Sequence, residues 1–252
     1  HMALIDIARQ VQESVEVMVA SEERMQADGW PYQEFLAGLK CQIQADQTWQ
    51  CDAPQNKDAD GLGKHAVSVY HTYYEDPAHL DPQHTLSATR LNPKNQRNAA
   101  ACTLFDDLVS CVSVFAAELR TGVEDYLAQD DPTDNVQIKI KHEGREASEE
   151  MEDKNYIDLR HFAEKIRDSS VPAAYKSQAG PIYEALIKGG AIILANEHGS
   201  AHPNAHGLTL YFPHDQDLPE DANCKDAPDA GARKCGFDNP LPSPTLYAKD
   251  PT

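Results

Sequence analysis

The chain has 252 residues, enough for one large or two small domains, and 40% hydrophobic with 25% charged residues is ordinary for a globular protein. Its formal net charge of −19 argues against nucleic acid or an anionic membrane surface as a partner, because binding to either requires a basic surface, and no apolar run approaches a membrane span. The acidity favours encounter with a cationic partner or substrate, although it could serve solubility alone.

The N-terminal quarter alternates between helical patterns and polar loops. Apolar residues at three- and four-residue steps predict a helix over residues 3–19. The Asp28-Gly29 step then predicts a loop with a defined turn, and a second helix is expected over residues 32–40. Residues 41–65 are rich in Asp, Gln and Lys, so we expect a loop there.

The middle of the chain has one long helical pattern between less regular segments. Residues 67–74 have a weak periodicity that fits a strand or a helix, and residues 75–84 interrupt it with prolines and histidines. A strand is expected over residues 85–91 and a long amphipathic helix over residues 93–129. Residues 130–153 are highly charged, which predicts an exposed connection.

Helices and short apolar strands intermix in the C-terminal part, which is typical of an α/β layered fold. Helices are predicted over residues 156–167 and 179–188, and buried strands over residues 191–195 and 207–213. Residues 214–252 are rich in Pro and Asp and lack periodicity. We expect this tail to be ordered if a disulfide staples it.

The six cysteines occur in three local pairs, none of them a C-x-x-C. The pairs are Cys41 with Cys51, Cys102 with Cys111, and Cys224 with Cys235. Their even number and close spacing predict three short-loop disulfides and an oxidising compartment, either extracellular or periplasmic. Sequence does not fix the connectivity, and six buried free thiols are the alternative. A zinc site is disfavoured because the ligand spacing is wrong.

Several segments together resemble the clostripain-like cysteine peptidases. Val19-Ala-Ser-Glu-Glu23 followed by Asp28-Gly-Trp-Pro-Tyr32 is similar to the segment after that family's catalytic Cys. Asn204-Ala-His-Gly-Leu-Thr-Leu-Tyr-Phe-Pro213 resembles its Ala-x-Gly-Leu-Ser-Ile-Tyr-Phe-Pro strand. Between them, Tyr156-Ile-Asp-Leu-Arg-His-Phe162 resembles its Asp-Leu-x-x-Phe helix, and Thr85-Leu-Ser-Ala88 matches a shorter signature. Their shared order makes chance agreement improbable.

The resemblance implies a caspase-like α/β fold over residues 1–213, with helices packed on a mostly parallel sheet, and a tail over residues 214–252. It also implies a secreted cysteine endopeptidase that cleaves protein or peptide substrates after Arg or Lys. The family's catalytic His and Cys lie upstream of the matched part, so no catalytic residue is expected in this chain. The expected partner is an N-terminal chain of the same precursor that carries both residues and completes the sheet.

Asp28 is the main candidate for substrate binding. By resemblance it lies on the loop that shapes the primary specificity pocket, where a carboxylate pairs with a guanidinium or ammonium group. The alternative is an Asp-Gly turn residue that caps its own backbone. Ser21 and Glu22 are expected nearby. The pair His198-Gly199 imitates a catalytic His-Gly pair, but no Cys is near it in sequence and its position does not match the family's His.

Two patterns suggest metal ligands. Residues 56–61 match the first half of a calcium loop, with Asp58 and Asp60 as ligands, but the closing Glu is missing, and a flexible polar loop is the alternative. The four-residue spacing of three histidines suggests a metal-binding helix face, but Gly199 and Pro203 disrupt that helix. We therefore interpret as exposed loop residues His198, His202 and His206.

A second hypothesis comes from another functional class. The acidic loop and the paired cysteines also fit a non-catalytic extracellular binding module, calcium-dependent or not, that keeps a peptidase fold. A serine or metal hydrolase acting alone has little support, because the chain contains no G-x-S-x-G elbow and no H-E-x-x-H motif.

Overall fold

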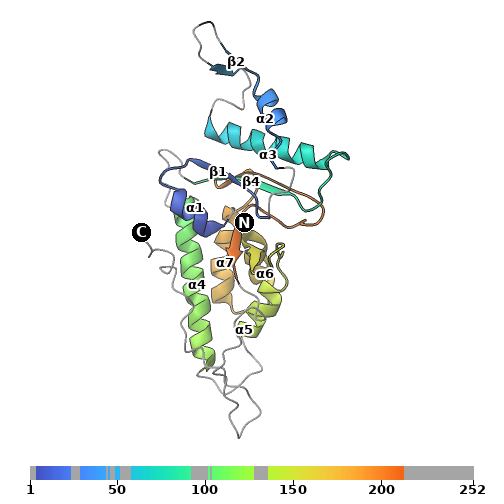
Figure 1. Ribbon diagram of the computed structural model, residues 1–252. Helices are drawn as coiled ribbons and strands as arrows, with labels where there is room; N and C mark the ends of the chain where they lie inside the picture. The colour runs from blue at the N-terminus through green and yellow to red at the C-terminus, as the bar shows by residue number, and fades with distance from the viewer. Residues whose placement is uncertain are drawn as a thin grey trace, which may run out of the picture. The chain divides into compact units, whose positions relative to one another are not determined.

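A computed structural model describes residues 4–23, 29–43, 45, 49–51, 58–91, 102, 104–127 and 136–212. These residues form the predicted mixture of helices and short strands (Figure 1). The helices are α1 (Ile5–Val11), α2 (Tyr32–Leu39), α3 (Ala59–Glu75), α4 (Phe105–Leu127), α5 (Val136–Lys139), α6 (Leu159–Asp168) and α7 (Ala173–Ala185), with a π-helical turn at Ile140–Arg145. The strands are β1 (Val17–Ala20), β2 (Cys41–Ile43), β3 (Trp49–Cys51), β4 (Thr85–Arg90), β5 (Tyr156–Asp158), β6 (Ile193–His198) and β7 (Thr209–Tyr211).

The described strands pair antiparallel, which corrects the expectation of a mostly parallel sheet for this part of the chain. β4 lies between β1 and β6 and is antiparallel to both, and β2 with β3 and β5 with β7 form two-stranded antiparallel pairs. Parallel neighbours arise when one crossover helix returns the chain to the end where the first strand began. Between β1 and β4 the chain instead forms α2, the β2–β3 hairpin and α3.

Helix α3 covers one face of the three-stranded sheet (Figure 1). Its buried residues Val67, Tyr70 and Tyr74 pack in one apolar cluster with Leu86 of β4 and Leu194 of β6. Their spacing follows the helical repeat, which is why this segment forms a helix. The structure therefore resolves the ambiguity over residues 67–74, and α3 begins at Ala59 inside the segment expected to be a loop.

A larger apolar cluster is built mainly from α4, α6 and α7 (Figure 1). Within it, α7 packs against both α6 and α4. Phe162 of α6 has no exposed surface and contacts the rings of Phe115 and Phe212. Ile166 and Ile182 are also completely buried there. No helix within the described ranges is both long and apolar enough to cross a membrane.

The predicted helix over residues 3–19 is wrong in its second half. The helix ends at Val11, and residues 17–20 form β1, which pairs with residues 87–90 of β4. Val17 and Val19 pack toward the cluster under α3. β-Branched residues accommodate a strand well, and pairing with a distant strand overrides the local helical periodicity.

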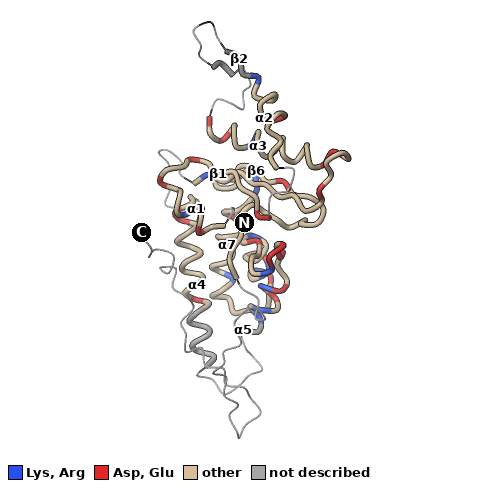
Figure 2. Tube along the Cα trace, viewed as in Figure 1, with Lys and Arg blue, Asp and Glu red and all other residues tan. Residues whose placement is uncertain are grey.

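From residue 136 onward, the charged segment 130–153 is more ordered than the sequence predicts. It contains α5 and the π-helical turn, with Lys139 and Lys141 near the start of this part and a run of acidic residues at its end (Figure 2). Arg145 is buried, where its guanidinium pairs with Glu150 and donates to the backbone carbonyl of Lys154. A buried charge requires such partners, so this connection is part of the folded protein. The segment expected as one helix over residues 156–167 begins instead with β5.

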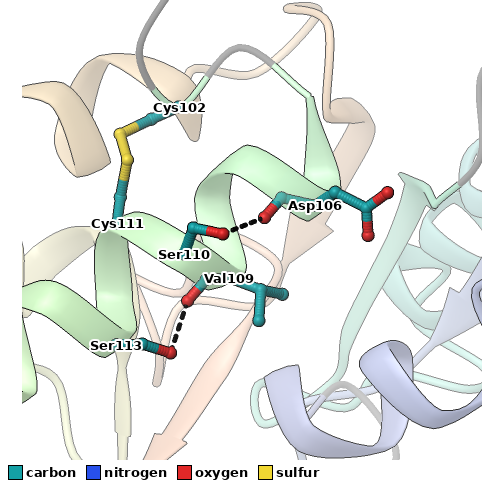
Figure 3. The surroundings of a disulfide bond; sticks show 6 residues. All are labelled: Cys102, Asp106, Val109, Ser110, Cys111 and Ser113. Carbon is teal, nitrogen blue, oxygen red and sulfur yellow. Dashed lines mark hydrogen bonds between the residues drawn. A yellow bond between two sulfur atoms is a disulfide. The ribbon is translucent and has the colours of Figure 1, made fainter.

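Cys102 and Cys111 form a disulfide, as predicted (Figure 3). Cys111 lies in the second turn of α4, and the Cα atoms are 6.0 Å apart, within the range that a disulfide spans. The backbone register of the β2–β3 hairpin places Cys41 directly opposite Cys51. Cys224 and Cys235 lie outside the described residues, as does the whole tail from residue 213.

Candidate functional site

Three polar residues directly after β1 form the floor of a buried acidic cluster. Ser21, Glu22 and Glu23 are at most 5% exposed. The hydroxyl of Thr85, the first residue of β4, accepts hydrogen bonds from the backbone amides of Glu22 and Glu23 at 3.0 and 3.1 Å. It also lies 3.0 Å from the Ser21 hydroxyl. This single threonine therefore fixes the turn by which the chain leaves β1.

Glu22 shares its buried environment with Asp158, the last residue of β5. The carboxylate of Glu22 accepts a hydrogen bond from the amide of Gly207 at 3.1 Å. Asp158 caps α6 by accepting from the amide of His161 at 2.6 Å, and it also accepts from the amide of His206 at 2.6 Å. These contacts join three segments that the family resemblance had identified separately.

Burial makes ionisation of both carboxyl groups costly. It raises the pKa of Asp158 to about 7 and, together with the neighbouring Asp158, raises the pKa of Glu22 well above its usual range. Because the two carboxyl groups are buried as neighbours, the protonated form of the pair is favoured at higher pH than for a carboxyl group in water. Burial also lowers the pKa of the neighbouring His206 to about 3, which keeps that imidazole neutral.

A second acidic pair surrounds His202. Its Nε2 lies 3.3 Å from the Glu23 carboxylate and its Nδ1 lies 3.2 Å from the Glu149 carboxylate. Glu149 also accepts from the side-chain amide of Asn204 at 3.0 Å, and Glu23 accepts from the backbone amide of Glu152 at 2.6 Å. His202 therefore bridges the end of β1 to residues 149–152.

This cluster is equipped to position backbone and to attract a cation. Its groups are carboxylates, imidazoles and hydroxyls, and the part of it that the structure describes contains no cysteine. Buried acidic groups with perturbed pKa values are typical of functional sites, although structural networks also produce them.

The structure brings together part of the predicted site. Ser21 and Glu22 lie side by side in the cluster, whereas Asp28 lies outside the described residues. Asp58 instead caps α3, where its side chain accepts from the amide of Gly61 at 2.7 Å. Asp60 in the first turn of α3 pairs with the guanidinium of Arg90. Both carboxylates of the predicted calcium loop therefore have protein partners, away from the cluster.

Sequence reasoning missed several members of the cluster. Glu23, Thr85 and Asp158 all stand within the segments that resemble the family, and that was the signal that could have identified them. The interpretation of His202 as an exposed loop residue is wrong, because it is 9% exposed between two glutamates. Glu149 carried no signal, because nothing distinguishes it from the other acids of its charged segment.

Comparisons with known proteins show which family the chain resembles. A search of curated proteins finds no match. A solved structure of a B. fragilis cysteine protease has 12% identity and a TM-score of 0.43, covering 85% of this chain and 76% of that one. The inactive zymogen of a C11 protease from Parabacteroides distasonis has 12% identity and a TM-score of 0.45, covering 85% of this chain and 50% of that one. The sequence profile of the clostripain family matches residues 1–215. The chain belongs to the clostripain family of cysteine peptidases.

Proposed function

We propose that this chain is the C-terminal part of a secreted cysteine endopeptidase that cleaves after Arg or Lys. Its catalytic Cys and His come from an upstream segment of the same precursor. Family membership supports the peptidase class, and the Cys102–Cys111 disulfide supports an oxidising compartment. The observation that carries the specificity is the buried acidic cluster around Glu22, Glu23 and Asp158, which favours a cation over an apolar or anionic side chain.

In this proposal the upstream His activates the Cys as nucleophile and later protonates the leaving amine. Backbone amides near these residues stabilise the oxyanion. The present chain contributes the wall of the pocket for the P1 side chain. Ser21 and Glu22 hold the base of that wall through the contacts of Thr85.

Asp28 is the proposed contact for the P1 guanidinium or ammonium group. The described residues on either side of residues 24–28 are held by hydrogen bonds. On one side, Glu23 accepts from the amide of Glu152. On the other, the carbonyl of Gly29 accepts from the hydroxyl of Tyr74 at 2.6 Å.

The proposal is tested by measuring peptide cleavage by the full chain together with its upstream segment. We expect hydrolysis of fluorogenic peptides with Arg or Lys at P1, abolished by alkylation of the catalytic Cys. Asp28→Asn should lower kcat/KM for these peptides by about 100-fold, and leave the slow cleavage of a peptide with Gln at P1 unchanged. Asp168→Asn, which changes an exposed carboxylate on α6, is the matched control.

Two results would contradict different parts of the proposal. Absence of Cys-dependent cleavage would overturn the peptidase assignment for this chain and favour the non-catalytic binding module. Cleavage after Arg that is unaffected by Asp28→Asn would overturn the role of Asp28 and leave the peptidase intact.

A further inference from the structure

Two histidines and a carboxylate converge at the C-terminal end of α3, apart from the acidic cluster. His71 and Glu75 lie one turn apart on α3, and His84 immediately precedes β4. Nδ1 of His71 lies 3.0 Å from Nε2 of His84, which lies 3.9 Å from a carboxylate oxygen of Glu75. One potential ligand atom from each residue falls within 4.8 Å of the other two.

The outward nitrogens of both imidazoles face acceptors. Nδ1 of His84 lies 2.5 Å from the carbonyl oxygen of Asp81, so this nitrogen carries the proton and donates it. Nε2 of His71 faces the carboxylate of Glu197 on β6 at 4.0 Å. Metal-bound histidines have this arrangement, in which the second ring nitrogen faces a carbonyl or a carboxylate.

The inward nitrogens face each other across 3.0 Å, either as a hydrogen bond that one imidazole donates to the other or as two lone pairs directed at one ion. The carboxylate of Glu75 on the same side adds a third, negatively charged donor, which a divalent ion uses more fully than a proton does.

We propose that His71, Glu75 and His84 bind a divalent transition metal of the zinc class, with water completing the coordination. Two imidazoles and a carboxylate are a common ligand set for such ions, whereas calcium prefers oxygen ligands. At metal–nitrogen bonds of about 2.0 Å, two ligands on a tetrahedron lie about 3.3 Å apart, so the observed separation requires little adjustment.

Two of the three ligand side chains are partly exposed, which allows an ion to enter from solvent. The His84 side chain is completely buried, whereas those of His71 and Glu75 are 33% and 48% exposed. The rings of Tyr70 and Tyr74 pack about the His84 ring, with centroids 6.2 and 6.0 Å away. The aromatic side lowers the local dielectric and strengthens the metal–ligand attraction, while the other side admits water.

The position of His84 gives the ion a structural role. His84 is adjacent to Thr85, which organises the acidic cluster, and its carbonyl accepts from the amide of Gly199 at 2.7 Å. The carbonyl of Pro82 likewise accepts from the amide of Ala201 at 2.8 Å. An ion held by α3 and His84 therefore ties the end of this helix to the start of β4 and to the turn after β6.

The test uses the full chain without an affinity tag, stripped with a chelator and dialysed. Calorimetric titration with Zn²⁺ should show one site, and Co²⁺ should give visible absorption bands of a bound ion. His71→Ala and Glu75→Gln should each weaken Zn²⁺ binding by at least about tenfold, because each removes a direct ligand. Both residues are partly exposed, so these variants should keep the wild-type circular dichroism and fold.

His79→Gln is the control, because His79 stacks on Tyr73 near the cluster without belonging to it. This variant should bind Zn²⁺ like wild type, and Zn²⁺ should raise the Tm of wild type and of His79→Gln but not that of His71→Ala. Absence of Zn²⁺ binding, or equal binding by wild type, His71→Ala and Glu75→Gln, would overturn the site. A direct hydrogen bond between the two imidazoles would then account for their separation.

Discussion

Asp158 and Phe162 lie one turn apart at the start of α6 and both have no exposed surface, yet their burial has opposite energetic consequences. Phe162 lies among other rings, and removing its apolar surface from water stabilises the fold by about 2–3 kcal/mol. Asp158 lies beside Glu22, and its burial raises its pKa to about 7.

The acidic cluster is therefore maintained against a desolvation cost that the apolar cluster does not have. Backbone amides that donate to the Glu22 and Asp158 carboxylates offset part of that cost. The two clusters also differ in what they hold together, because the apolar cluster packs helices against one another whereas the acidic cluster joins the ends of β1 and β5 to residues 202–207. Three substitutions test this comparison, one in each cluster and one at the surface.

The largest expected effect is that of a substitution in the apolar cluster. Phe162→Ala should lower the free energy of unfolding by about 3–5 kcal/mol, because it removes a completely buried ring and leaves a cavity between α4 and α6. Urea denaturation of the full chain measures this. Val114→Ala on the exposed side of α4 is the control and should change stability by less than about 0.5 kcal/mol. Similar losses in both variants would show that Phe162 is not in a tightly packed core.

A smaller effect, on how stability depends on pH, is expected for the acidic cluster. In the folded chain the raised pKa values of Glu22 and Asp158 keep a proton bound between about pH 4 and pH 7, where the unfolded chain has released it. Stability from this proton is therefore fully present below about pH 4 and is lost as pH rises through about 7.

Glu22→Gln should weaken this dependence, because it removes the contribution of Glu22 and leaves that of Asp158. The amide imitates the protonated acid, because its oxygen can still accept from the amide of Gly207 while its NH₂ donates to Asp158. Thermal melts across this pH range test the effect, with Glu34→Gln on exposed α2 as control. A pH profile unchanged by Glu22→Gln would mean that Glu22 does not contribute to this dependence.

The smallest effect is expected for a polar residue at the surface. Asp58→Ala should cost about 1 kcal/mol, because it removes the hydrogen bond that caps α3. Urea denaturation measures this change as well. The same variant, compared with Asp60→Ala in calorimetric titration with Ca²⁺, tests the predicted calcium loop. Ca²⁺ binding that both substitutions leave unchanged would contradict that loop, and a loss much above 1 kcal/mol would contradict the role of Asp58 as a simple cap.

Local sequence patterns predicted the elements whose characteristic residues lie close together in the sequence. The strand before Leu91, the helix around Phe162 and the paired cysteines at 102 and 111 were predicted because periodicity and spacing act within a short stretch. Ordered motifs also placed the chain in its family and brought Ser21 and Glu22 into the candidate site. These features depend on near neighbours, which a sequence displays directly.

Tertiary structure decided what depends on distant partners. Residues 17–20 became a strand because β4 was available to pair with them, and Arg145 became a buried residue because Glu150 and residue 154 neutralise and satisfy it. Glu22 meets Asp158, and His71 meets His84, only after the chain has folded. A sequence records which groups carry charge, whereas the fold determines which of those charges lose their water and which groups they meet instead.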